Sequence, residues 1–64
     1  MMEYTNKEAE IVALNSRLEG LKHYLNSLLK INSDPRYKTD LSEEMNRVNN
    51  DIKEVQIKLD GLIT

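Results

Sequence analysis

The chain contains few of the residues that form disulfides, interrupt helices or carry large aromatic side chains. Its 64 residues include no cysteine, tryptophan or phenylalanine, one histidine, one proline and two glycines. Without cysteine there is no disulfide framework and no thiolate metal site, a composition that fits a reducing compartment. No apolar run approaches the roughly 18 residues that a membrane-spanning helix needs, and the N-terminal stretch lacks the basic start and apolar core of a signal peptide. We therefore expect a cytoplasmic protein with no membrane partner.

An excess of one charge is also missing. Nine Lys and Arg residues stand against eleven Asp and Glu residues, which gives a net charge of −2. Both signs are spread along the chain, so the sequence has no broad basic face of the kind that binds nucleic acid or anionic lipid. This balance argues against nucleic acid as the main partner.

Groups that carry out chemistry are scarce. His23 has Glu19 one helical turn before it, but two ligands make a poor metal site, and no cysteine or second histidine completes it. The same shortage removes the base that a serine nucleophile needs. The carboxylates fall near helix starts and on exposed positions rather than together in an apolar pocket. We expect no catalytic residues, no metal and no cofactor, and hence no enzyme.

Hydrophobic periodicity is the strongest signal that is present. In a heptad, positions a to g cover two helical turns, and apolar a and d residues form a seam. The seam residues of the first run are Tyr4, Ile11, Leu14, Leu18, Leu21, Leu25 and Leu28, with Lys7 as the polar exception, and those of the second run are Leu41, Met45, Val48, Ile52, Val55, Leu59 and Leu62. This pattern predicts an all-α fold, an antiparallel two-helix hairpin that forms a single domain over residues 1–64.

Capping signals predict where the first helix begins and ends. Thr5 and Glu8 match the capping box, in which each side chain accepts a hydrogen bond from the other residue's backbone N–H. Asn32 can adopt the left-handed conformation that closes a helix. The first helix is therefore predicted over residues 5–31.

The start of the second helix has two candidates. Asp34 followed by Pro35 looks like an N-cap with proline at the first helical position, where its missing N–H costs nothing. This interpretation gives a bend at residues 32–34 and a second helix over residues 35–63. The rival start is the box-like stretch at residues 40–43, which would leave a looser loop of about seven residues.

Facing seam positions favour the tight bend. In an antiparallel pair, an a position of one helix shares a layer with a d position of the other. The tight bend satisfies this along the whole hairpin, for example by pairing Leu18 with Val48, and lets the two helices end flush. The rival register also pairs a with d but leaves Tyr4 and Lys7 overhanging. We therefore predict the tight bend.

A single seam leaves a hairpin short of buried apolar surface. Ordering about 60 residues costs on the order of 1.5 kcal/mol each, so the isolated hairpin should be marginally stable. Apolar residues outside the seam offer more surface to bury: Tyr24, Ile31 and Tyr37 at g positions on one flank near the bend, Leu29 on the opposite flank, and Val12, Ile57 and Ile63 at the far end. We expect self-association, most simply a homodimer that forms a four-helix bundle, or docking on another protein.

The bend end is the predicted interface. Its residues are Tyr24, Leu29, Lys30, Ile31, Arg36, Tyr37 and Lys38. They predict a non-catalytic protein–protein interaction module, a subunit, adaptor or inhibitor that presents a rigid helical face to a partner or to itself. In a less favoured alternative, the basic residues of this set and Tyr37 hold an RNA backbone in a hairpin dimer.

A short stretch resembles a known family. Ser42-Glu43-Glu44-Met45-Asn46, after an aspartate-proline bend, is similar to the Ser-Gln-Glu-Leu-Asp signature of the sporulation-regulating aspartyl-phosphate phosphatases of bacilli. The resemblance covers residues 21–50 and implies a helical hairpin that acts on a phosphorylated response regulator. Asn46 stands where the family has the aspartate on which its activity relies, Glu43 replaces the glutamine, and the spacing from the proline is one residue longer. The alternative function is thus a small regulatory phosphatase or a relative that only binds.

Overall fold

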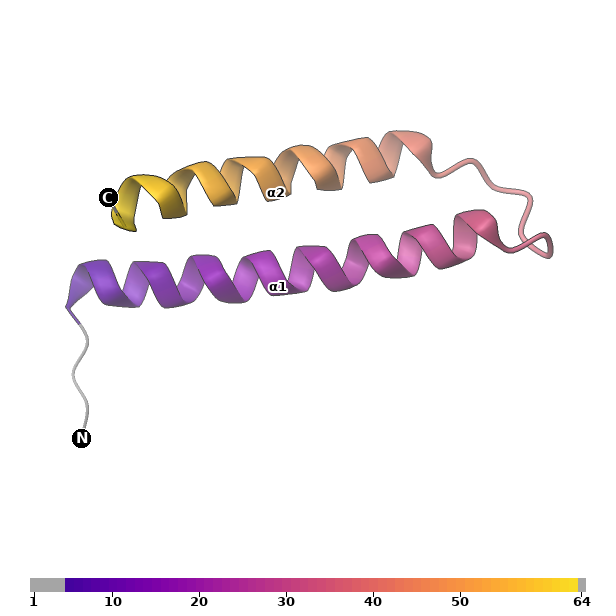
Figure 1. Ribbon diagram of the computed structural model, residues 1–64. Helices are drawn as coiled ribbons and strands as arrows, with labels where there is room; N and C mark the ends of the chain where they lie inside the picture. The colour runs from indigo at the N-terminus through magenta and orange to yellow at the C-terminus, as the bar shows by residue number, and fades with distance from the viewer. Residues whose placement is uncertain (1–4, 64) are drawn as a thin grey trace.

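The fold is a helical hairpin. The computed structural model describes residues 5–63, and within them it contains two helices and no strand: α1 (Asn6–Ser33) and α2 (Ser42–Ile63). The helices lie side by side and antiparallel, with the start of α1 and the end of α2 at the end away from the loop (Figure 1). The two helices lie in a single layer (Figure 1). The prediction of an all-α two-helix hairpin is confirmed.

The N-terminus of α1 is capped as the sequence predicts. Thr5 has extended backbone angles, φ −66° and ψ 162°, and its Oγ1 accepts a hydrogen bond of 3.1 Å from the Glu8 backbone N–H. Glu8 Oε1 accepts one of 3.2 Å from the Thr5 N–H. These reciprocal bonds satisfy two donors that the first turn leaves without helical partners, so they fix where α1 begins.

The predicted tight bend is wrong. α1 continues to Ser33, two residues beyond its predicted end, so Asn32 is part of the helix. No residue within 5–63 has a positive φ, so Asn32 does not adopt the predicted left-handed conformation. α2 begins at Ser42, as in the rival prediction, and not at Pro35. A loop over residues 34–41 therefore replaces the predicted bend at residues 32–34.

Local chemistry explains why no helix starts at Pro35. The proline disfavours helical angles in the residue before it, and Asp34 is extended, with ψ 120°. The Asp34 carbonyl accepts a hydrogen bond of 3.1 Å from the Tyr37 N–H, while its carboxylate accepts one of 2.9 Å from the Arg36 N–H. Asp34 thus closes a four-residue turn of the kind in which proline is favoured at the second position. α2 begins instead at Ser42, where the Asp40 carboxylate accepts a hydrogen bond of 2.9 Å from the Ser42 N–H.

The observed register keeps lysine out of the seam. Leu18 packs in one cluster with Val55 and Leu59, and Asn32 Oδ1 accepts a hydrogen bond of 3.3 Å from the Leu41 N–H. These contacts belong to the rival register, one heptad away from the predicted one.

The predicted register fails for a reason that the seam residues make plain. It would have placed Lys38 opposite Leu28 and Lys7 opposite Leu59, and a charged group in a seam position costs desolvation. In the structure Leu28 and Leu59 are both buried, while Lys7 and Lys38 are exposed. Avoiding those two layers favours the longer loop.

The seam supplies the whole core of the described residues. Its buried side chains are Leu18, Leu28, Val48, Val55 and Leu59, and the remaining predicted seam residues from Ile11 onward are half-buried. The seven apolar residues that the sequence places outside the seam are all exposed. Tyr4, the first predicted seam residue, lies outside the described residues. Among residues 5–63, neither helix has the length and apolar character needed to cross a bilayer.

Candidate functional site

The loop end carries a compact polar turn. The Asp34 carboxylate accepts hydrogen bonds from Arg36, at 3.1 Å from Nε and 2.7 Å from Nη2, in addition to the bond from the Arg36 backbone N–H. The Arg36 side chain and then its backbone N–H hold the pKa of Asp34 below its usual value. The Arg36 guanidinium lies 5.9 Å from the centre of the Tyr37 ring, within cation–π range. This turn orders Tyr37 outside any helix, so its predicted place at a g position is wrong.

A second polar structure links the two helices near the loop. The Tyr24 hydroxyl on α1 donates a hydrogen bond of 2.7 Å to Glu44 Oε2 on α2. Glu44 Oε1 accepts from Arg47 Nε at 2.5 Å, and Arg47 Nη1 donates to Asp51 Oδ2 at 3.1 Å. We call these four residues the tyrosine flank.

Hydrogen bonds explain the pKa shifts within the tyrosine flank. The Arg47 guanidinium and then the Tyr24 hydroxyl lower the pKa of Glu44, since both donate to its carboxylate. The hydrogen bond to Glu44 is also the main cause that raises the pKa of Tyr24. Sequence reasoning missed this network, although the signal was available: Tyr24 and Glu44 are both g positions, and g positions of antiparallel helices face each other on one flank.

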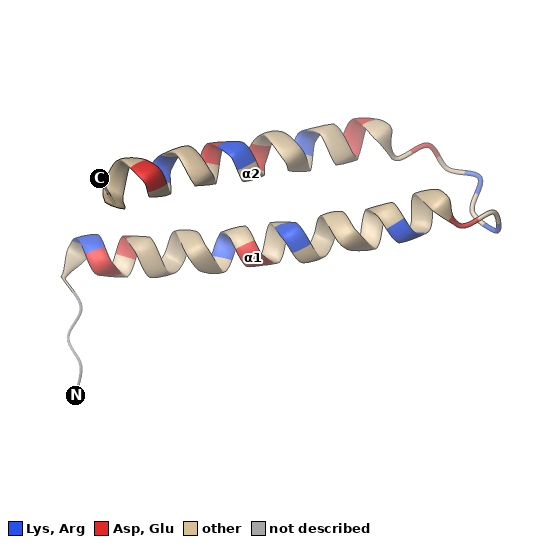
Figure 2. Cartoon of the chain, viewed as in Figure 1, with Lys and Arg blue, Asp and Glu red and all other residues tan. Residues whose placement is uncertain are grey.

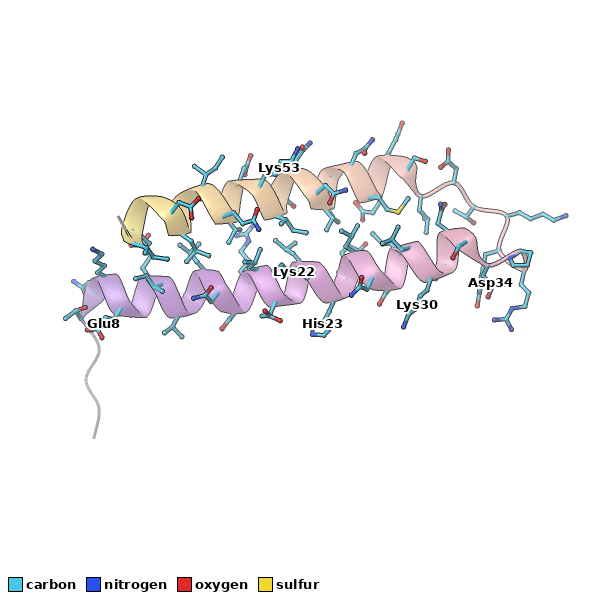
Figure 3. All side chains as sticks on the ribbon, viewed as in Figure 1. Glu8, Lys22, His23, Lys30, Asp34 and Lys53 are labelled. Carbon is cyan, nitrogen blue, oxygen red and sulfur yellow. The ribbon has the colours of Figure 1, made fainter. Side chains whose placement is uncertain are left out.

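The predicted interface residues are exposed but point in several directions. Tyr24 and Ile31 occupy g positions of α1 and Leu29 an e position, which lies on the opposite flank of the same helix. Lys30 points away from α2 (Figure 3). Tyr24 and Ile31 thus lie on the same side of α1, and Arg36 contacts Tyr37 in the loop.

The basic residues near the loop are not a separate patch. Arg36 is paired with Asp34, and Lys30 and Lys38 are exposed on α1 and in the loop. Figure 2 shows acidic and basic residues interspersed along both helices and through the loop. A nucleic-acid backbone would therefore meet carboxylates together with the lysines.

The stretch that resembles the phosphatase signature opens α2. Ser42 donates through its backbone N–H and its hydroxyl to the Asp40 carboxylate, and Glu44 belongs to the tyrosine flank. Met45 is half-buried in the seam, and Asn46 is exposed. The segment thus has a clear structural role in starting the helix and joining it to α1.

Metal-binding and concave sites can be described for residues 5–63 only. No group of three or more His, Cys, Asp and Glu side chains is arranged to hold a metal ion there, and no pocket is found. His23 is exposed and points away from α2 (Figure 3). The candidate site is accordingly a surface of the hairpin.

Comparison with known proteins adds no relative. A scan against protein-family models, a search of curated proteins and a search of solved structures each give no match for this chain. Function must therefore be argued from the hairpin itself.

Proposed function

We propose that this protein is a non-catalytic interaction module, a helical hairpin that reaches full stability by associating with a second helical surface. The hairpin presents a rigid face, and association covers apolar side chains that its own seam leaves in water. In this role it acts as a subunit, adaptor or inhibitor of a larger assembly.

The exposed apolar side chains are the observation that carries this proposal. Seven large apolar side chains of residues 5–63 lie outside the seam and are 39–70% exposed: Val12, Tyr24, Leu29, Ile31, Tyr37, Ile57 and Ile63. Exposed apolar surface of this kind marks sites where proteins associate. A second helical surface would remove part of this apolar area from water.

The loop end offers the aromatic anchors for a partner. Tyr24 is 42% exposed and Tyr37 is 52% exposed, and both are held in place, the first by Glu44 and the second beside Arg36. Tyrosines with a fixed orientation lose little conformational freedom on binding, and interface hot spots are enriched in tyrosine.

A concentration series of thermal unfolding tests the proposal. We expect the midpoint, followed by circular dichroism, to rise between about 5 and 500 µM protein if the second surface is another copy, because only the folded state is stabilised by association. A low midpoint that does not change with concentration would point to a different partner. A high midpoint with no dependence on concentration would contradict the proposal, since the hairpin would then be complete alone.

A paired affinity purification tests docking at the loop end. We expect a partner retained by the wild type to be lost by the double variant Tyr24→Ala, Tyr37→Ala while its helicity is unchanged. The matched control is Ile57→Ala, Ile63→Ala, which removes exposed apolar side chains from the far part of α2. Equal retention by all three proteins would contradict docking at the tyrosines.

The phosphatase alternative stays a prediction from the sequence. Its support is the similarity of residues 42–46 and the position of that stretch at the start of the second helix. The amide of Asn46 replaces the carboxylate that the resemblance requires, so the interaction proposal makes no use of it.

A further inference from the structure

A second line of side chains runs along one face of α1, beside the seam. We call it the α1 stripe: Val12, Asn15, Glu19, Lys22, Asn26 and Leu29. These residues recur at alternating intervals of three and four, the spacing of a helix–helix seam, and all six are exposed. They occupy e and b heptad positions, on the opposite side of α1 from Tyr24. Lys22, labelled in Figure 3, lies midway along the helix.

The α1 stripe is complementary to its own reverse. Its pairs share one midpoint, between Gly20 and Leu21, so that a second α1 running antiparallel brings Leu29 opposite Val12 and Lys22 opposite Glu19. The remaining pair matches the amides of Asn15 and Asn26. Each facing position thus meets a side chain of suitable chemistry: apolar with apolar, amide with amide, and cation with anion.

The charges of the α1 stripe favour an antiparallel arrangement of two α1 helices. In a parallel arrangement Glu19 would face Glu19 and Lys22 would face Lys22, and like charges in facing positions repel. The antiparallel arrangement gives two opposite-charge pairs and two apolar contacts, one at each end. It also has the twofold symmetry in which both copies use the same patch.

The charges of the α1 stripe are free to pair with another chain. The side chains of Glu19 and Lys22 make no hydrogen bond or ion pair with the described residues, although they lie three residues apart on one helix. On the other side of the hairpin, Glu44, Arg47 and Asp51 already satisfy one another. Val12 and Leu29 are 50% and 49% exposed, so their apolar area is also available.

We infer that a second copy of this chain binds along the α1 stripe, α1 against α1 and antiparallel, to form a twofold-symmetric dimer. This inference rests on the proposed function, because it names the partner surface that completes the hairpin.

Charge reversal followed by mixing tests the inference. Glu19→Lys brings two lysines together in each facing pair, and Lys22→Glu brings two glutamates together, so each variant alone should dimerise at least about tenfold more weakly than the wild type. In an equimolar mixture every facing pair becomes opposite in charge again. We expect the mixed dimer to form with an affinity within about threefold of the wild-type value.

The mixture controls for damage within the helix. Both variants lose the same attraction between positions 19 and 22 of one chain, and mixing does not restore it, so recovery can arise only between chains. Glu54→Lys and Lys30→Glu are matched reversals on exposed positions outside the stripe and should leave dimerisation unchanged. Sedimentation equilibrium measures each affinity, and circular dichroism confirms helicity.

The outcomes separate this inference from the proposed function. If the wild type dimerises and both reversals dimerise equally well, the α1 stripe is not the interface, while the interaction module stands. If the wild type remains monomeric at about 500 µM, the inference fails, and a low unfolding midpoint then keeps the proposed function with a different partner.

Disulfide trapping tests the direction of the helices. The natural chain has no cysteine, so Val12→Cys and Leu29→Cys can each be introduced as a single thiol. These positions are about 25 Å apart along α1, and a disulfide needs Cβ atoms about 4 Å apart. We expect oxidation to link the two variants in a mixture and to leave each variant alone unlinked. Rapid linking of one variant to itself would overturn the antiparallel arrangement.

Discussion

The two sides of the hairpin handle their charges differently. On the tyrosine flank, Glu44 accepts from Tyr24 across the hairpin and from Arg47 along α2, and Arg47 continues to Asp51. On the α1 stripe, Glu19 and Lys22 make no such bond within the described residues. The charged groups of the tyrosine flank are hydrogen-bonded within one chain. The charged and exposed apolar side chains of the α1 stripe remain available to contact another chain.

This difference suggests a division of roles. The hydrogen bond between Tyr24 and Glu44 joins the helices near the loop, beside the part of the seam that holds the buried residues Leu28 and Val48. A surface already bonded within the chain gains little from a charged partner, because the existing bonds must be broken first. The free side is the better candidate for a second copy, and the exposed tyrosine rings remain available for an apolar partner.

The largest expected effect separates the seam from the α1 stripe. Leu28→Ala should destabilise the hairpin by about 2–5 kcal/mol, because it removes a buried side chain and leaves a cavity. Leu29→Ala, next to it but exposed, should leave the monomer almost unchanged and weaken only the dimer. Urea unfolding at low protein concentration measures both. A small effect of Leu28→Ala would favour the register in which this residue faces Lys38.

Gly20 tests whether the tyrosine side of α1 faces solvent. A Cβ added at this position meets no atom within 4 Å, and alanine is favoured over glycine in helix interiors. Gly20→Ala should therefore stabilise the monomer by about 0.5–1 kcal/mol and leave dimerisation unchanged. Weaker dimerisation of this variant would show that a second copy packs closely against that side.

Acid pH should weaken the tyrosine flank. The pKa of Glu44 is lower in the folded state than its usual value of 4.5, so the stability that this carboxylate contributes is present above that value and is lost as the pH falls through the folded-state pKa. Glu44→Gln removes this proton uptake and should show a smaller loss of stability between about pH 5 and pH 3. Denaturation at a series of pH values measures the difference, and identical pH profiles would contradict it.

The smallest effect isolates the hydroxyl of Tyr24. Tyr24→Phe removes one of the two donors to Glu44, so the pKa of Glu44 should move back toward 4.5 while the Arg47 bond persists. An NMR titration of the Glu44 carboxyl measures this shift. The stability of the monomer should change only slightly, since the bond is exposed to water. An unchanged titration would mean that the hydroxyl does not bond to Glu44 in solution.

Prediction succeeded where one helix or one seam decides the outcome. Helical spacing alone predicts the seam positions and the exposure of Val12, Leu29 and Ile57. The capping box at Thr5 follows from the types of two residues three positions apart. The observed start of α2 was the less favoured of the two predictions. The sequence Asp34-Pro35 is equally typical of a helix start and of a turn, so it does not distinguish between them.

The sequence by itself determined that there are two helices and which stripe of each is buried, since these depend on residues three and four apart. Only the tertiary structure decided how the stripes are matched. The register depends on which distant side chains face each other, and a shift of one heptad keeps every a position opposite a d position. The cost of placing lysine opposite Leu28 and Leu59 favours one shift over the other, and that shift in turn makes residues 34–41 a loop and brings Tyr24 to Glu44.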